Sequence, residues 1–307
     1  MVRRSLNLII AALLLFAAQI AHASCEKCKG EEVWSPTTPG PFTTFTAPVI
    51  DQGKFSVQPF YFFNIARGLF DGQGHYSSLP KRDYKYNQQT SIYSTYGIFK
   101  CIEVNAQPLW QMNNIKVGDK SAESAGFGDL LLNTRFCGVE ESYWCPRITG
   151  MFQVKLPTGK YQKGDPEKLG GDLPGTGSTD YTYGISFTKG IKPVLWHVDL
   201  FYSNSPQPVR IDGIKTKFND TYYVNAAFEW MITKKMDIMS ELNWQTQGDK
   251  KLDGDWAADT GKSSLTWAIG IGYSEKDWQM LVGYLRVLAG ENNDANDSIG
   301  ATVIVTF

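Results

Sequence analysis

Alternation of apolar and polar residues is the dominant pattern along this chain. In its last ten residues, SIGATVIVTF, Val303, Val305 and Phe307 share one side of an extended strand, because successive strand side chains point to opposite faces. The same period of two recurs from residue 54 onward. It predicts twelve strands, at 54–64, 88–98, 101–111, 126–138, 146–156, 179–189, 193–203, 219–231, 236–246, 263–274, 278–288 and 298–307.

The segments between these strands alternate in length. Short gaps fall at 99–100, 139–145, 190–192, 232–235 and 275–277. Long polar gaps fall at 65–87, 112–125, 157–178, 204–218, 247–262 and 289–297. An even number of strands joined in this way is typical of a bacterial outer-membrane barrel. The sequence therefore predicts an all-β, antiparallel transmembrane β-barrel of about twelve strands, with short periplasmic turns and long extracellular loops.

The end of the chain supports closure of this barrel. An open sheet edge in lipid leaves backbone groups unpaired at a cost of several kcal/mol each, so the last strand must pair with the first, at 54–64. A strand that ends on an outward aromatic residue also suits the signal read by the outer-membrane assembly machinery, with Val303, Val305 and Phe307 as its residues. A secreted β-sandwich is the alternative fold, but it explains fewer of these features.

The first residues predict export. Arg3 and Arg4 precede an apolar run at 8–18 and then Ala21-His22-Ala23, which is the order of a signal peptide cleaved after residue 23. A lipoprotein would instead be modified on Cys25, and His22 fits that signal poorly. We expect residues 1–23 to be a signal peptide and the mature protein to lie in the outer membrane, with lipid as a partner.

Residues 24–53 differ from the rest of the chain. Their stretch SPTTPGPFTTFTAP is rich in proline and threonine, which predicts an irregular segment. It could lie in the periplasm or fold into the lumen as a partial plug, and the sequence leaves both alternatives open. Residues 54–307 form the barrel domain.

Composition removes several classes of function. The formal net charge is −1 and no basic block occurs, so nucleic acid is not an expected partner. After the signal peptide no stretch of 18 apolar residues predicts a membrane helix. Aromatic residues make up 13 % of the chain and there are 29 glycines, a composition that suits a membrane barrel with one apolar face per strand.

The opposite face of the strands is polar and charged. A hydrated barrel interior tolerates such residues, whereas the lipid face does not. Two interpretations stay open: a path for a solute, or an ion-pair network that supports a nearly filled barrel. The predicted lumen-lining residues are Glu103, Asp129, Arg135, Arg147, Lys155, His197, Asp199, Glu229 and Glu241, with Asn105, Gln107, Asn133, Gln153, Asn243 and Gln245 among the uncharged ones.

Catalytic and cofactor motifs are weak. His197 and Asp199 share a face and could orient an imidazole for base catalysis, but the sequence positions no serine beside them. The stretch KLPTGKY, 155–161, lacks the spacing of a phosphate-binding loop and is better explained as a turn. We predict no catalytic residues, no cofactor and no metal.

The five cysteines include three in the barrel. Cys137 and Cys145 flank a short turn, which favours a disulfide between them, although Cys101 begins a neighbouring strand and competes for Cys137. Cys25 and Cys28 form a C-x-x-C pair near the mature N-terminus, where a disulfide or tether is the simpler interpretation than a redox or metal site.

Four stretches resemble a known family. They are TAPVIDQGKFSVQPFYFF (46–63), GFGDLLLNTRF (126–136), KLPTGKY (155–161) and GTGS (175–178), and the C-terminal AGENNDANDSIGATVIVTF adds to them. The chain resembles the outer-membrane transporter-like barrels named after the meta-pathway of phenol degradation. This resemblance implies passive, channel-like uptake of small organic compounds, with aromatic or hydrophobic ones favoured. The alternatives are a structural or surface-interaction barrel with a closed lumen and, less favoured, a barrel hydrolase.

Overall fold

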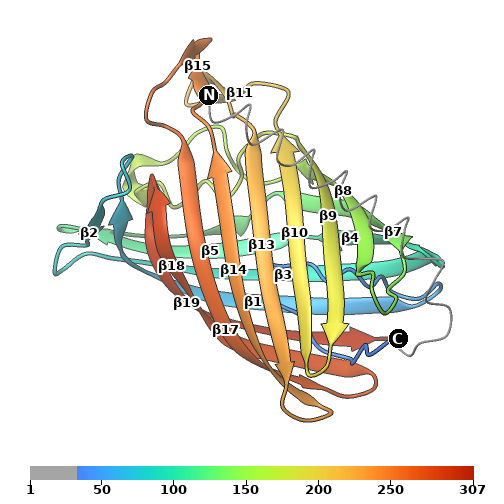
Figure 1. Ribbon diagram of the computed structural model, residues 1–307. Coiled ribbons are helices and arrows are strands. Elements are labelled where there is room, and N and C mark those ends of the chain that lie inside the picture. Colours follow the sequence, from blue (N-terminus) through green and yellow to red (C-terminus); the bar gives the residue numbers. More distant parts are fainter. Residues whose placement is uncertain (1–32) are drawn as a thin grey trace.

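The computed structural model describes residues 33–307, so the predicted signal peptide and the Cys25–Cys28 pair lie outside the described residues. Within the described part, no helix is long and apolar enough to cross a membrane. Twelve strands form a closed antiparallel barrel, which confirms the predicted fold class (Figure 1). These strands are β1 (Phe55–Phe70), β3 (Tyr84–Phe99), β4 (Ile102–Gln107), β7 (Leu130–Val139), β8 (Arg147–Leu156), β9 (Asp180–Ile191), β10 (Val194–Asn204), β13 (Thr221–Met231), β14 (Met236–Gln247), β17 (Lys262–Ser274), β18 (Trp278–Glu291) and β19 (Asn293–Thr306).

The barrel closes through β1, which pairs with β19 on one side and with β3 on the other. At the seam, the Phe307 N–H donates to the Phe55 carbonyl at 2.8 Å, and the Phe55 N–H donates to the Phe307 carbonyl at 3.3 Å. The two rings stack with centroids 6.5 Å apart. The last residue is therefore part of the closure, as the strand pattern predicts.

Side chains alternate between the two faces of the wall as expected for strands. On β10, Trp196 is 50 % exposed on the outside, whereas His197 is 2 % exposed on the inside. The outer surface carries most of the exposed apolar side chains. Aromatic residues gather near the short turns, which mark what we call the turn end of the barrel; they include Phe55, Phe99, Tyr143, Trp144, Trp230, Trp278 and Phe307.

Two segments predicted as long loops are strands instead. Residues 112–125 belong to a hairpin of β5 (Leu109–Val117) and β6 (Lys120–Phe127), and residues 289–297 continue β18 and β19 around a turn at Asn292. Their polar sequences lack the alternating pattern of a strand, because strands that extend beyond the bilayer need no apolar face. Pro108 separates β4 from β5, since proline has no N–H for the ladder.

The other connections lie at the opposite end of the barrel, here called the loop end. A short strand, β2 (Tyr76–Ser78), pairs with β1 there. A small second sheet joins two loops: β11 (Val209–Ile211) and β12 (Ile214–Lys217) from one, β15 (Lys251–Leu252) and β16 (Asp255–Trp256) from the other. Figure 1 shows β11 and β15 standing above the barrel rim.

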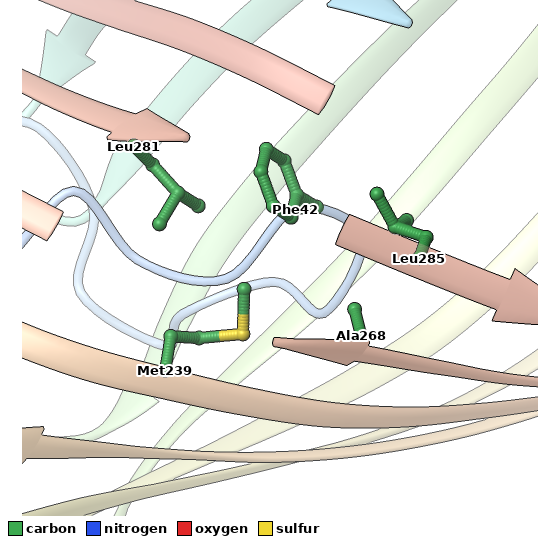
Figure 2. Close-up of a cluster of buried hydrophobic side chains, with 5 residues drawn as sticks. All are labelled: Phe42, Met239, Ala268, Leu281 and Leu285. Carbon is green, nitrogen blue, oxygen red and sulfur yellow. The ribbon is translucent and has the colours of Figure 1, made fainter. Parts of the chain in front are cut away.

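The facing of β18, which its sequence leaves ambiguous, is settled by an apolar cluster inside the barrel. Leu281 and Leu285 point inward and pack with Met239 and Ala268 around Phe42, which comes from the N-terminal segment (Figure 2). Inward leucines are unusual in a polar lumen. They occur here because Phe42 covers them.

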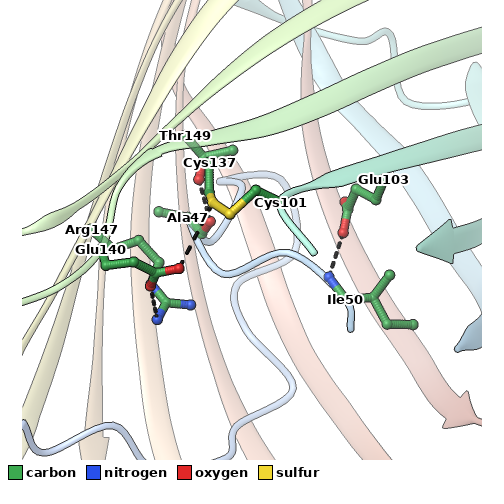
Figure 3. Close-up of a disulfide and its surroundings, with 8 residues drawn as sticks. All are labelled: Ala47, Ile50, Cys101, Glu103, Cys137, Glu140, Arg147 and Thr149. Atoms are coloured by element: carbon green, nitrogen blue, oxygen red, sulfur yellow. Dashed lines mark hydrogen bonds and ion pairs between the residues drawn. A yellow bond between two sulfur atoms is a disulfide. The ribbon is translucent and has the colours of Figure 1, made fainter. Parts of the chain in front are cut away.

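The disulfide joins Cys101 to Cys137, so the predicted Cys137–Cys145 bridge is wrong (Figure 3). Adjacent strands β4 and β7 place the two Cα atoms 5.0 Å apart, and the Cys137 N–H donates to the Cys101 carbonyl at 3.0 Å. On β8, the residue opposite Cys137 is Thr149. Cys145 lies four residues earlier, in the turn, which takes it out of reach.

Peptide mapping of the full chain without reduction is expected to recover the Cys101 peptide joined to the Cys137 peptide. The reduced sample, run in parallel, should release both. A Cys137–Cys145 peptide would contradict the pairing of β4 with β7.

Candidate functional site

The N-terminal segment, residues 33–53, runs inside the barrel. Ala47 is fully buried, its N–H donates to the Thr188 hydroxyl at 2.8 Å, and its carbonyl accepts a hydrogen bond from the Thr149 hydroxyl. Prolines keep the segment from adding to the sheet. The wall also makes room for it, because a side chain at Gly190 would collide with the Trp34 carbonyl.

Glu241 on β14 is the strongest anchor of this segment. Its carboxylate accepts hydrogen bonds from the Phe42 N–H (3.0 Å), the Thr43 N–H (3.1 Å) and the Thr44 N–H (2.7 Å). The Thr44 hydroxyl donates at 2.9 Å, and the Thr43 hydroxyl also donates. Hydrogen bonds to a charged group contribute about 1.5–3 kcal/mol each, so this one carboxylate binds residues 42–44 firmly.

Two further carboxylates continue the anchoring along the segment. Asp199 Oδ2 accepts from the Phe45 N–H at 2.5 Å, and Glu103 Oε2 accepts from the Ile50 N–H at 2.6 Å, as Figure 3 shows for Glu103. Arg135 forms a buried ion pair with Glu103 at 2.8 Å and donates to the Thr46 carbonyl. The backbone of the segment therefore supplies hydrogen-bond donors to three buried acidic side chains of the wall.

His197 is buried in the wall beneath this segment. Its Nε2 lies 2.7 Å from Glu229 Oε1, and its Nδ1 lies 2.9 Å from the Thr188 hydroxyl. Its partner is thus Glu229 on the neighbouring strand, whereas Asp199 binds Phe45.

The Thr188, His197 and Glu229 side chains follow the order of a nucleophile, base and acid. However, Ala47 covers Thr188, and all three side chains are buried. A substrate has no room beside the hydroxyl. The geometry favours a structural role for these residues over hydrolysis.

Phe45 spans the lumen between two opposite walls. Its ring centroid lies 6.2 Å from that of Tyr93 on β3 and 5.8 Å from that of Phe201 on β10. The Arg135 guanidinium lies 5.6 Å from the same ring, at a cation–π distance. Phe45 therefore obstructs the lumen between β3 and β10.

Cavities lie on both sides of Phe45. One of about 380 Å³ borders the wall that contains β13, and we call it the β13 cavity. Another of about 330 Å³ borders β1 and β3. Thr43, Phe45 and Gln153 line both. A third cavity of about 640 Å³, the rim cavity, lies at the loop end between β1, β3, β5 and residues 169–173.

Asp129 and Lys155 lie at the loop end and hold the loop 157–178. Asp129 accepts hydrogen bonds from the Gly159 N–H (3.1 Å) and the Thr176 N–H (2.9 Å), and Lys155 pairs with Asp180. In the same loop, the Lys160 ammonium beside Asp172 lowers the pKa of that carboxyl. The loop is therefore tied down by charged contacts at its base and near its tip.

Replacing Asp129 by alanine is expected to release the base of this loop and to let its backbone at Lys160, Lys163 and Lys168 enter the active site of trypsin. Limited proteolysis of folded protein should then cut within 157–178 at least several times faster than in wild type. Asp83→Ala, at the same end of the barrel but outside this loop, is the control. Unchanged cleavage in Asp129→Ala would show that Asp129 does not hold the loop.

Of the predicted lumen-lining residues, six meet at or beside the N-terminal segment and are buried: Glu103, Arg135, His197, Asp199, Glu229 and Glu241. The other three do not join them. Asp129 and Lys155 belong to the loop end, and Arg147 pairs with Glu140 at 2.6 Å beside the turn 139–145.

Sequence reasoning missed the aromatic residues of the lumen. Phe45, Tyr93 and Phe201 were not predicted, nor was Asn225, which pairs in register with Asn243. Alternation from His197 and Asp199 would have placed Phe201 inward. No local pattern marks Phe45, because its segment is irregular.

Comparison with known proteins gives a structural match only. No protein-family model matches the sequence, and no curated protein matches it. The chain is similar to the COG4313 outer membrane channel from Pseudomonas putida F1, at 12 % identity and a TM-score of 0.69, over 84 % of this chain and 97 % of that one. It is also similar to the NanC porin, at 9 % identity and a TM-score of 0.46, over 82 % and 98 % of the two chains. At 12 % identity, the likeness to the COG4313 channel shows the fold alone, that of an outer-membrane β-barrel.

Proposed function

We propose that this protein is a channel of the bacterial outer membrane through which small organic molecules diffuse down their gradients. One observation carries the proposal: the barrel interior is not filled by the side chains of its own wall. A single irregular segment occupies it, with cavities of about 380 and 330 Å³ on either side. A barrel that serves only as a scaffold needs no such space.

Several features support the membrane location. The outer surface is apolar, and aromatic side chains gather near the turn end, as they do at the membrane interface of outer-membrane barrels. Residues 1–23 have the pattern of a signal peptide. In this proposal, lipid surrounds the barrel and the assembly machinery recognises the strand that ends at Phe307.

Residues 33–53 act as the plug of the channel in this proposal. Their backbone N–H groups donate hydrogen bonds to the buried carboxylates of Glu241, Asp199 and Glu103. Passage of a solute through this part of the lumen requires residues 42–45 to shift, because Phe45 bridges β3 and β10. Solute flow should therefore be controlled by how tightly this plug is held.

The proposed solutes are small organic compounds, aromatic or hydrophobic ones included. Resemblance to the barrels named after phenol degradation supports this choice. Aromatic rings of Phe45, Tyr93 and Phe201 lie together in the lumen, where flat apolar molecules could pass by stacking contacts.

A structural barrel with a permanently closed lumen is the second candidate. Five donors on Glu241 and the apolar packing of Phe42 favour it, since both hold the plug in place.

Reconstitution of the full chain separates the two functions. Liposome swelling with sugars and with aromatic acids, together with conductance in planar bilayers, should show solute entry and discrete channels. Absence of both would refute the channel and leave the structural barrel.

Replacing Phe45 by alanine is expected to join the two cavities beside it and to raise single-channel conductance severalfold. Phe152→Ala, the same change on the outward face of β8, should leave conductance at the wild-type level. Equal conductance in wild type and Phe45→Ala would show that the obstruction lies elsewhere.

A further inference from the structure

The β13 cavity has no charged side chain in its lining. Its walls come from β8 to β10, β13, β14, β17 and β18, and its floor from Thr43 and Phe45 of the plug. At about 380 Å³ it lies within the range of small-molecule sites, roughly 300–1,000 Å³. The charges of the lumen thus lie outside this cavity, although several are close to it.

Four amide side chains line the cavity, those of Gln153, Asn225, Asn243 and Gln245, together with several hydroxyl groups. Two of these amides form a pair on neighbouring strands. Asn225 on β13 and Asn243 on β14 are direct cross-strand partners, so their side chains lie side by side. Asn225 is only 7 % exposed, and Asn243 Oδ1 is a buried acceptor with no hydrogen-bond partner among residues 33–307. Leaving such groups unsatisfied is costly, so they favour a ligand that both donates and accepts hydrogen bonds.

Several apolar side chains line the same cavity. Phe201 and Met151 are buried on the wall, Leu285 packs against Phe42, and the Phe45 ring closes the floor. A pocket with mostly apolar walls and a few placed polar groups is the usual form of a small-molecule site. A flat ring with hydroxyl groups at its edge would pack against the apolar side chains and form hydrogen bonds with the amides.

The electrostatics of the β13 cavity disfavour ionised ligands. Glu241 and Asp199 lie beneath the cavity, but backbone N–H groups of residues 42–45 already bind them. The cavity surface offers no counter-ion, and a charge that leaves water without one is strongly disfavoured. An anion would in addition face these two carboxylates.

We propose that the β13 cavity is a binding site for an uncharged ring that bears hydroxyl groups, either a saturated ring such as a sugar or an aromatic ring such as a phenol. The inference deepens the proposed function, since this ligand would be a solute held on its way through the channel. Asn225 and Asn243 bind its hydroxyl groups, and Phe45 and Phe201 cover its face.

Equilibrium binding to the full chain in detergent tests the proposal with four probes. Glucose, glucosamine and glucuronate share one ring and differ in charge, and resorcinol supplies an aromatic ring with hydroxyl groups. Glucose should bind more tightly than glucosamine and glucuronate. Resorcinol binding together with glucose, or in its place, assigns the site to an aromatic ring and supports the proposal equally.

Leucine variants identify the site. Asn225→Leu and Asn243→Leu keep the side-chain volume and remove the amide, and each should weaken binding about tenfold. Asn296→Leu makes the same change in the rim cavity and should bind as wild type does. Heat-modifiable migration on gels checks that each variant has folded, and two separate amide variants allow the test to proceed if one does not fold.

Binding of glucosamine or glucuronate as tight as that of the neutral probe that binds best would overturn the proposal, and so would binding of no probe or unchanged binding in both cavity variants. These failures differ from failure of the channel. A wild-type protein that conducts but binds no probe refutes only the site, whereas one that binds glucose or resorcinol but never conducts refutes only the channel.

Discussion

Replacing Glu241 by glutamine is expected to open the channel. The amide places an N–H₂ group among five donors from residues 42–44 and removes the charge that attracts them. Loss of about 3 kcal/mol of anchoring, the equivalent of one or two such hydrogen bonds, raises the population of the displaced plug about 100-fold. Planar-bilayer recordings should show larger and more frequent openings than in wild type.

The control is Glu229→Gln. Glu229 is as buried as Glu241 and lies on the neighbouring strand, but it binds His197 and makes no contact with residues 42–44. The amide oxygen of glutamine can still accept the His197 hydrogen bond. Wild-type currents in Glu241→Gln, or equal gains in both variants, would contradict the anchoring role of Glu241.

Replacing Phe307 by aspartate is expected to block most assembly into the outer membrane. Phe307 is 73 % exposed, stacks on Phe55 and completes the seam between β19 and β1. A charge near the membrane interface costs only about 0–1 kcal/mol by itself. A large loss of inserted protein must therefore come from the end signal and the seam, not from the charge alone.

Phe99→Asp separates these contributions. Phe99 is also an outward aromatic residue at the turn end, but it ends β3 and is not part of the β1–β19 seam. Most of this variant should insert, as measured by heat-modifiable migration of outer-membrane fractions. If Phe307→Asp inserts as well as Phe99→Asp, then Phe307 carries no signal beyond its apolar surface.

The strands are the part of the fold that local sequence predicts well. Period-two alternation is a property of each strand alone, and the lipid outside enforces it, so twelve strands and their closure follow without knowledge of contacts. The same alternation places Glu103, Arg135, His197, Asp199, Glu229 and Glu241 on the inner face, where the structure buries them.

Other features could not be predicted, because a strand that lies in water and not in lipid needs no alternation of apolar and polar residues. The hairpin of β5 and β6 and the turn at Asn292 have polar sequences that look like loops. The short distance along the chain favours Cys145 as the disulfide partner of Cys137. The pairing register of β4 and β7 instead places Cys101 beside Cys137.

The sequence by itself determined the barrel, its number of strands and the inward side of most of them, because each of these depends on neighbours one or two residues apart. Only the tertiary structure decided what fills the lumen. Phe42 meets Glu241 across 199 residues of chain, and Phe45 meets Asp199 across 154. Such contacts join an irregular backbone to single side chains and produce no periodic pattern in the sequence. The path of the plug, the inward leucines of β18 and the uncharged β13 cavity are therefore visible only in the folded chain.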